Sequence, residues 1–263
     1  MRPARLLIVA GSDSSGGAGL QADIKTADAF GVYAMTAVTA VTVQDTRKVY
    51  AVHPVPAAAV REQIARCLAD IGADAIKIGM LGSAAIARAV ADALQKHAAR
   101  IPIVLDPVMI ATSGRRLLSA DGVRLLKEQL LPLATLVTPN LPEARALAGL
   151  RGSGRGDVER AGRKLVAMGA KAALIKGGHS TRETVDDILV WEGGAELYAY
   201  PRLRTRHTHG TGCTLSTAVA CGLAQGLSLP LATGRAREFV QHAIETAPGF
   251  GRGHGPINHS RSN

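Results

Sequence analysis

The chain of 263 residues is predicted to form an α/β fold with a mostly parallel central sheet and helices on both faces. Apolar runs of strand length alternate with runs of helical periodicity from one end of the chain to the other, which is typical of doubly wound sheets. The composition agrees with such a layered fold: 47% of the residues are hydrophobic, only 3% are aromatic, and 29 are glycines suited to tight turns. We find no internal repeat and expect one domain over residues 1–263.

Each predicted strand is a short apolar run. Six of them are expected at Leu6–Ala10, Ala34–Val43, Ala75–Ile78, Ile101–Leu105, Leu136–Thr138 and Ala172–Ile175. Two more, Asp187–Trp191 and Glu196–Tyr200, flank the pair Gly193 and Gly194. A glycine pair between two such runs is a hairpin signal, so we expect antiparallel strands at one edge of the sheet.

The predicted helices fill the intervals between the strands. They cover Leu20–Phe30, Ser83–His97, Ser119–Leu131, Pro142–Leu147 and Val158–Met168, and one more helical face is formed by Val60, Ile64, Cys67, Leu68 and Ile71. Ser83 is expected to cap the N-terminus of its helix. Two helices close the chain, one on each side of Pro230, and Arg151–Gly156 is expected to be a surface loop.

The bulk properties bound the class of protein. The formal charge of +10 favours contact with anions, but the arginines are scattered along the chain and are not interleaved with aromatic residues, so nucleic-acid binding is only a minor alternative. Three cysteines form no paired spacing, which indicates a reducing compartment. The apolar run LLIVA after Arg5 is too short for a signal peptide, and no run reaches the roughly 18 apolar residues of a membrane span. We therefore expect a soluble, cytoplasmic protein.

Polar and glycine residues follow the predicted strands. These strand ends read Gly11-Ser12-Asp13, Gln44-Asp45, Gly79-Met80, Asp106-Pro107, Thr138-Pro139-Asn140 and Lys176-Gly177-Gly178-His179. Ligands of open parallel sheets bind beyond the carboxyl ends of the strands, so the sequence predicts a binding site on this rim. The loop GSDSSGGAG, Gly11–Gly19, matches neither the Walker A nor the GxGxxG pattern and is interpreted as a ligand loop, the alternative being a capping loop.

The segment THGTGCT, Thr208–Thr214, precedes a run with helical spacing. The first backbone N–H groups of a helix lack intrahelical partners and can bind an anion, and glycines such as Gly210 and Gly212 allow its close approach. A thiol at this position, Cys213, is expected to have a lowered pKa. The other interpretation is a tight turn that opens an ordinary buried helix, with Cys213 as a small core residue.

Two carboxylates and a lysine on the same rim suggest phosphate chemistry. Asp106 and Glu143 could hold Mg²⁺, mostly through water, and Lys176 could neutralise phosphate charge. Taken singly, each acid could equally be a helix cap or a solvated side chain, and Lys176 could be a surface lysine. The eight histidines show no set with zinc-ligand spacing.

Several long motifs in order resemble one family. They read GSDSSGGAGLQADIKT, TVQDT, KIGML, VLDPVM, TPNLPEA, IKGGH and THGTGCTLS. These motifs resemble the hydroxymethylpyrimidine/phosphomethylpyrimidine kinases of thiamine biosynthesis, within the ribokinase-like superfamily, and the likeness runs from Leu7 to about His259. The resemblance implies a three-layer sandwich with a mostly parallel central sheet, and ATP-dependent phosphorylation of 4-amino-5-hydroxymethyl-2-methylpyrimidine and then of its monophosphate.

The resemblance also implies roles for residues at the substrate end of the site. Gln44 would hydrogen-bond the aminopyrimidine, because an amide offers both a donor and an acceptor. Asp23, Gly11 and Met80 would complete the substrate pocket. One position departs from the family pattern: Asp45 follows Gln44 where asparagine is expected, which adds a charge near the substrate.

For the transfer step, the resemblance implies that Gly210, Gly212 and Cys213 form the anion hole around the γ-phosphoryl group. Cys213 stands where most ribokinase-like enzymes have an aspartate and is the candidate catalytic base. ATP would be bound by Lys176, Asn140 and Thr208, and Mg²⁺ by Asp106 and Glu143. A monovalent cation is a further candidate cofactor, and a homodimer is expected.

Two other functions compete with this interpretation. Pyridoxal kinases are related enzymes that phosphorylate a ring hydroxymethyl of similar size. A non-catalytic nucleotide-binding or nucleic-acid-binding protein is suggested only by the positive charge. We expect neither nucleic acid nor membrane as a partner.

Overall fold

The computed structural model describes residues 2–111, 114–151, 154–178 and 183–260. Residues 152–153 of the predicted loop Arg151–Gly156 and His179 of the IKGGH motif therefore lie outside the described residues. In the described part of the chain, no helix is long and apolar enough to cross a membrane.

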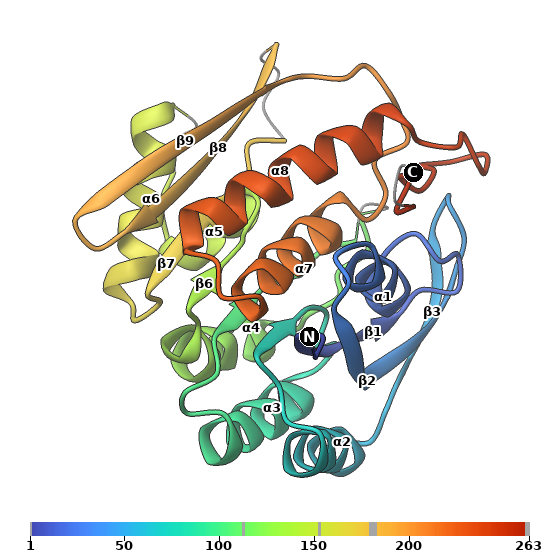
Figure 1. Ribbon diagram of the computed structural model, residues 1–263, viewed down its shortest axis with the longest axis vertical. Coiled ribbons are helices and arrows are strands. Elements are labelled where there is room, and N and C mark those ends of the chain that lie inside the picture. The colour runs from blue at the N-terminus through green and yellow to red at the C-terminus, as the bar shows by residue number, and fades with distance from the viewer. Residues whose placement is uncertain (1, 112–113, 152–153, 179–182, 261–263) are drawn as a thin grey trace.

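The described residues form one nine-stranded sheet, in the order β3-β2-β1-β4-β5-β6-β7-β8-β9 (Figure 1). Its strands are β1 (Arg5–Ser12), β2 (Tyr33–Gln44), β3 (Val49–Pro54), β4 (Ala75–Ile78), β5 (Ile103–Leu105), β6 (Leu136–Val137), β7 (Ala172–Ile175), β8 (Thr184–Trp191) and β9 (Gly194–Pro201). The pairs from β2 to β7 are parallel, whereas β3, β8 and β9 pair antiparallel with their neighbours. The predicted mostly parallel sheet with an edge hairpin, β8 and β9, is confirmed.

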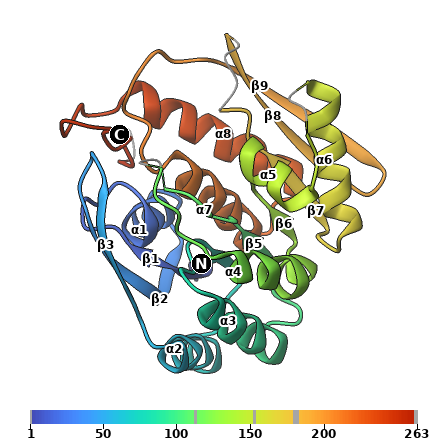
Figure 2. The same cartoon turned by 180° about the vertical axis from the view of Figure 1, so that it is seen from behind.

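Helices cover both faces of the sheet (Figures 1 and 2). One face carries α1 (Gly19–Ala29), α7 (Thr211–Ala224) and α8 (Leu229–Glu245). The other face carries α2 (Ala57–Asp70), α3 (Ala84–His97), α4 (Ala120–Leu125), α5 (Leu141–Ala148) and α6 (Arg155–Ala167). The result is a three-layer sandwich.

The interior strand β1 shows why its residues Leu6–Ala10 are all apolar. Leu7 and Val9 belong to the core beneath α2 and α3, whereas Leu6 and Ile8 belong to the core beneath α1 and α7. Successive side chains of a strand point to opposite faces, so in a strand covered on both faces successive side chains are all buried and mostly apolar.

The helix starts follow local capping rules. Ser83 accepts a hydrogen bond from the Ile86 N–H at the start of α3, as predicted. Ser119 does the same for α4, but that helix ends at Leu125 and continues as a π-helical turn and a 3₁₀ turn to Leu133. The predicted Ser119–Leu131 helix is thus correct in place and only partly α-helical.

Two elements differ from the prediction. Strand β3 was not predicted: its apolar run, Val49–Val52, is only four residues long, and the strand lies at the sheet edge with most residues exposed or half-buried. Helix α6 begins at Arg155, three residues before the predicted Val158, so the end of the predicted loop Arg151–Gly156 is helical. Its early start lacks apolar residues, and apolar periodicity therefore could not show it.

Candidate active site

A cavity of about 710 Å³ opens at the carboxyl ends of the parallel strands. Nearly all the residues that the sequence singled out for a site line this cavity, namely Gly11, Gln44, Met80, Asp106, Asn140, Glu143, Lys176, Thr208, Gly210, Gly212 and Cys213. A cavity therefore lies on the rim of the sheet where the sequence predicts a site. A volume of this size is typical of small-molecule sites.

Asp23 is the exception. Its side chain lies in α1 with no exposed surface, and among the described residues it does not line the cavity. Oδ2 accepts a hydrogen bond from Lys77 Nζ at 2.7 Å, and Oδ1 accepts one from Thr217 Oγ1 at 2.7 Å. The prediction that Asp23 belongs to the wall of the substrate pocket is wrong, because both carboxylate oxygens are directed at buried partners on β4 and α7.

Lys77 is the charged residue that reaches the cavity at this point. It belongs to the buried strand β4 and lines the cavity floor, although its side chain is only 1% exposed. Burial is the largest effect and opposes its charge, but the adjacent Asp23 carboxylate together with Cys213 and Asp106 outweighs it and holds the pKa of the Lys77 ammonium above its usual value. Lys77 thus supplies a fixed positive charge beneath the site.

The start of α7 depends on two glycines. Gly210 is the N-cap with φ of 86°, and a Cβ there would lie 1.8 Å from the Gly17 carbonyl oxygen. A Cβ on Gly212 would lie 3.1 Å from Lys176 Nζ. The two missing side chains let the loop after β1 and the Lys176 ammonium approach the first turn of α7, where N–H groups are open to an anion.

Cys213 is the third residue of α7, as the sequence predicted, but its pKa moves the other way. Burial raises the pKa of the thiol to about 11, and the carboxylates of Asp23 and Asp106 add to this effect. Lys77 and a hydrogen bond from the Gly19 backbone oppose it without cancelling it. The expected lowering by the helix start is overcome by desolvation of the thiol, although the half-buried residue still lines the cavity.

Lys176 and Asp106 form an ion pair beside the glycines of α7. Lys176 Nζ donates to Asp106 Oδ1 at 2.8 Å, and Thr138 Oγ1 donates to the same oxygen at 3.3 Å. Lys176 follows β7 directly, Asp106 follows β5 and Thr138 follows β6, so the three side chains converge because their strands are parallel neighbours. The pair is nearly buried, with side-chain exposures of 14% and 3%.

Asn140 and Glu143 cap helix α5. The Glu143 N–H donates to Asn140 Oδ1 at 2.9 Å, and the Asn140 N–H donates to Glu143 Oε2 at 2.9 Å. Burial raises the pKa of Glu143 to about 7, and Asp106 adds to the effect while Lys176 opposes it. The capping alternative is therefore realised, and both residues still face the cavity.

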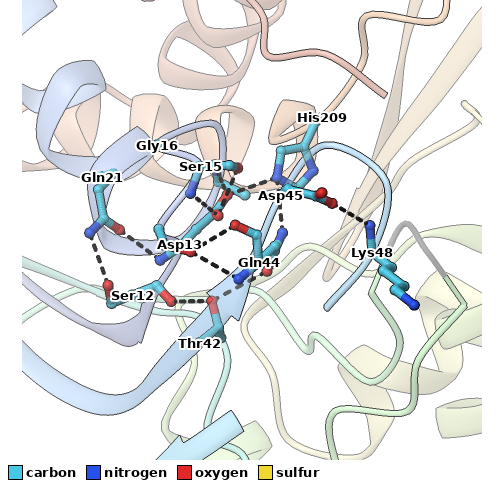
Figure 3. A network of polar contacts seen from close by, with 12 residues as sticks. Ser12, Asp13, Ser15, Gly16, Gln21, Thr42, Gln44, Asp45, Lys48 and His209 are labelled. Carbon is cyan, nitrogen blue, oxygen red and sulfur yellow. Dashed lines mark hydrogen bonds and ion pairs between the residues drawn. The ribbon is translucent and has the colours of Figure 1, made fainter. Parts of the chain in front are cut away.

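At the opposite end of the cavity, side chains from distant segments form a polar network (Figure 3). Asp13 Oδ2 lies 2.8 Å from His209 Nε2, and the Gln44 side-chain amide lies 3.1 Å from the same His209 nitrogen. Ser14 Oγ donates to the Gln44 carbonyl oxygen at 2.7 Å and accepts from the Gln44 N–H at 2.9 Å. The backbone and side chain of Gln44 are thereby both held at the end of β2.

Asp45, which stands where the family pattern has asparagine, makes local hydrogen bonds. Its Oδ1 accepts from the N–H groups of Arg47 and Lys48, and its Oδ2 accepts from the hydroxyl of Tyr50 at 3.0 Å. These contacts hold the pKa of the Asp45 carboxyl below its usual value. The carboxylate caps the turn between β2 and β3, and among the described residues it does not line the main cavity.

The chain is similar to known proteins over nearly its whole length. A family model described as phosphomethylpyrimidine kinase matches residues 13–258. The chain belongs to this family. It is 46% identical over 258 residues to a hydroxymethylpyrimidine/phosphomethylpyrimidine kinase of Streptomyces coelicolor, a match that covers 98% of this chain and 94% of that protein. It is 45% identical over 254 residues to the thiamine biosynthesis bifunctional protein ThiED of Geobacter sulfurreducens, and spans 52% of that longer protein.

A solved structure agrees with the fold. The ADP complex of a Bacillus subtilis pyridoxal kinase matches with a TM-score of 0.92 and 36% identity, over 98% of both chains. The ribokinase-like fold is confirmed by this match and by the sheet order. Membership of the phosphomethylpyrimidine kinase family makes the chain a phosphotransferase.

Several residues that line the cavity of this phosphomethylpyrimidine kinase family member were not predicted from the sequence. Besides Lys77 and His209, they include Asp187 of β8 and Arg237 of α8, whose side chains form a buried ion pair at 2.9 Å. Asp187 Oδ1 also accepts from the Gly177 N–H at 2.7 Å, which fixes the loop after Lys176. A charged residue inside an apolar run, such as Lys77 in AIKI, is the signal that could have shown such a position.

The C-terminal segment of the chain closes against the same loops. The His209 N–H donates to the Gly255 carbonyl oxygen at 3.1 Å, and the His254 N–H donates to the Thr46 carbonyl oxygen at 2.8 Å. His259 is buried, with Nε2 at 2.9 Å from Thr214 Oγ1 of α7. The segment GHGPINH, Gly253–His259, therefore supports the backbone of His209, the turn after Gln44 and the first turns of α7.

Proposed function

We propose that this chain uses ATP to phosphorylate 4-amino-5-hydroxymethyl-2-methylpyrimidine and then its monophosphate, as a step of thiamine biosynthesis. The observation that carries the proposal is a continuous cavity joining an amide for ring recognition, on Gln44, to an anion-binding helix start at Gly210 and Gly212. The family match supports phosphoryl transfer, and the volume of the cavity supports the binding of both reactants in it.

At the acceptor end, Gln44 binds the aminopyrimidine edge, and the backbone at Gly11 and the side chain of Met80 form the walls of the pocket. This proposal is supported by their positions on the cavity, where Met80 is largely buried and supplies an apolar surface. Asp23 acts through Lys77, whose ammonium faces the site. The hydroxyl of the 5-hydroxymethyl group then lies toward α7, where Cys213 can accept its proton.

At the donor end, Lys176, Asn140 and Thr208 hold ATP, and the first turn of α7 receives the transferring phosphoryl group. Phosphoryl transfer depends chiefly on positioning and on neutralising charge, and both are available here without a covalent intermediate. Lys176 is already held close to Gly212 by Asp106, so its ammonium is in place before a phosphate arrives.

Asp106 and Glu143 suit a Mg²⁺ ion that is held mostly through water and carried with the nucleotide. Both are oxygen donors on the cavity, and Lys176 and Thr138 both donate to Oδ1 of Asp106, which leaves Oδ2 for a ligand. Across the described residues, no group of three acidic, histidine or cysteine side chains could hold a metal by itself, in keeping with an ion that shares its ligands with the phosphates. When bound, such an ion would neutralise phosphate charge.

A turnover assay tests the substrate. The purified protein is supplied with ATP, Mg²⁺ and either the aminopyrimidine or pyridoxal, and the mono- and diphosphate products are followed with time. We expect higher kcat/KM for the aminopyrimidine and sequential formation of both products. Gln44→Ala should raise KM for the pyrimidine far more than it lowers kcat, because Gln44 binds the ring and does not take part in transfer.

Pyridoxal kinase activity is the second candidate, since the solved structure that matches with a TM-score of 0.92 is a pyridoxal kinase. A clear preference for pyridoxal in the same assay would replace the proposed substrate. Retention on DNA or RNA without ATP turnover would instead favour the non-catalytic alternative.

We further propose that the protein is a cytoplasmic homodimer and that a monovalent cation activates it. Size-exclusion chromatography with light scattering measures the oligomer. Turnover compared in potassium and in a bulky organic cation at equal ionic strength tests the activation.

A further inference from the structure

We propose that His209 and Thr42 fix the orientation of the Gln44 amide, with its oxygen toward His209 and its NH₂ toward Thr42, and thereby make the site select an amino group over a ring oxo group. The inference deepens the proposed function and rests on it. It assigns a positioning role to two side chains, His209 and Thr42, that surround the recognition amide (Figure 3).

The first step concerns the proton on His209. Asp13 Oδ1 accepts from both the N–H and the hydroxyl of Ser15 at 2.8 Å, and Oδ2 accepts from the Ala18 N–H at 2.9 Å. Although burial alone would raise it, the pKa of Asp13 stays below its usual value because of its contacts with His209 and Ser15. An ionised carboxylate can only accept, so the His209 nitrogen 2.8 Å away must carry a proton directed at Asp13.

The second step follows for Gln44. His209 Nε2 has no lone pair left once it carries that proton, so the Gln44 group 3.1 Å away cannot be an NH₂ donor. The structure has Gln44 Nε2 at 3.1 Å from His209 Nε2 and Gln44 Oε1 at 3.4 Å from Thr42 Oγ1. A half-turn about the last side-chain torsion exchanges the two amide atoms and costs little by itself. With the oxygen toward His209, the same N–H is shared between Asp13 and Gln44.

Thr42 requires the same orientation independently. Its hydroxyl donates its single proton to the Ser12 carbonyl oxygen at 2.8 Å. Toward the Gln44 amide atom 3.4 Å away, Thr42 Oγ1 can therefore only accept, and that atom must be the NH₂ nitrogen. Two neighbours at opposite ends of the amide thus favour one orientation and disfavour the other.

The fixed amide offers the cavity an acceptor and a donor in a set order. The remaining lone pair of Oε1 is on the His209 side, and the remaining N–H is on the Thr42 side. An aminopyrimidine matches this order with its amino group and adjacent ring nitrogen. A 4-oxo pyrimidine presents an N–H and a carbonyl in the reverse order. Binding it would require the half-turn of the Gln44 amide, which breaks the hydrogen bonds of Gln44 with both His209 and Thr42.

The test compares kcat/KM for the 4-amino substrate and its 4-oxo analogue at saturating ATP. The wild-type protein should prefer the amino substrate by about 100-fold or more. Thr42→Val should lower this preference by about 3- to 10-fold, the range for one hydrogen bond, and Thr42→Ser should restore it. His209→Phe, which keeps a ring and removes the donor, should lower the preference by about tenfold or more.

Thr39→Val is the matched control. Thr39 lies on the same strand, is buried, and donates to a backbone carbonyl oxygen, that of Met80, at 2.6 Å, without contacting Gln44. Its preference should equal that of the wild type, with thermal unfolding used to show that all variants are folded. A Thr42→Val preference equal to that of Thr39→Val would overturn the inference. A wild-type protein that does not phosphorylate the aminopyrimidine at all would overturn the proposed function itself.

Discussion

Lys77 Nζ lies 2.7 Å from Asp23 Oδ2, and the two side chains are 1% and 0% exposed. This ion pair joins β4 to α1, and Thr217 extends it to α7. Desolvation makes such a pair costly to build, and removing one partner leaves a buried charge without compensation. The fold thus has a fully buried ion pair directly beneath the cavity.

Asp23→Asn should therefore destabilise the protein strongly. The amide keeps the shape of the carboxylate but leaves the Lys77 ammonium without a negative partner, and we expect a loss of about 3 to 5 kcal/mol in the free energy of unfolding. Urea denaturation followed by circular dichroism measures it. Glu62→Gln is the control, because the Glu62–Arg66 pair has a similar N···O distance, 2.6 Å, but is largely exposed and should contribute less than about 1 kcal/mol. Equal losses in the two variants would contradict the burial argument.

Cys213→Ala should lower kcat by about two to four orders of magnitude if the thiolate is the base. Because the thiol pKa is raised to about 11, the thiolate fraction grows about tenfold for each pH unit between 7 and 10, and wild-type kcat should rise over that interval. The variant should lose this rise. Cys221→Ala, a buried cysteine further along the same helix, should keep the wild-type pH profile. Near-normal turnover of Cys213→Ala would remove the residue from the base role.

Gly212→Ala tests the approach of Lys176 to α7. The new methyl group would lie 3.1 Å from Lys176 Nζ, so the ammonium must shift by a few tenths of an ångström away from the helix start. We expect kcat/KM for ATP to fall by about 10- to 100-fold, as for other small displacements of positioning groups. Gly234→Ala in α8 is the control, since its methyl group would meet Tyr198 at an ordinary 3.6 Å. Unchanged kinetics in Gly212→Ala would show that this clearance is not used.

The layered fold and the rim of the sheet could be predicted because their signals are local. An apolar run such as Leu6–Ala10 identifies a buried strand by itself. A segment of glycine and polar residues after it, such as Gly11-Ser12-Asp13, identifies the end of the sheet where ligands bind. The edge strand β3 was not predicted because its apolar run, Val49–Val52, is short and alone does not distinguish a strand from other short apolar segments.

The pairing of charged groups could not be predicted from local patterns. Lys77 and Asp23 are 54 residues apart, and His209 and Asp13 are 196 apart, so only the folded topology brings them together. The predicted lowering of the Cys213 pKa was wrong for a related reason. Its position at a helix start is visible in the sequence, whereas the burial that dominates its pKa depends on how α7 packs against β4, β5 and the loop after β1.

His259 should make the protein sensitive to mild acid. Burial, with a smaller contribution from Lys25, lowers its pKa to about 4 from the 6.5 of an unfolded chain. Between pH 6.5 and 4 the unfolded chain binds a proton at this position that the folded protein does not, so stability must fall as the pH falls through that interval. The loss amounts to at most about 3 kcal/mol and ends below pH 4, where both states are protonated.

His259→Gln can still contact Thr214 but cannot titrate, so its unfolding free energy, measured in urea at several pH values, should depend less on pH over this interval. His97→Gln at the exposed end of α3 should behave as the wild type does. An equal pH dependence in wild type and His259→Gln would show that His259 is protonated in the folded protein or accessible to water there.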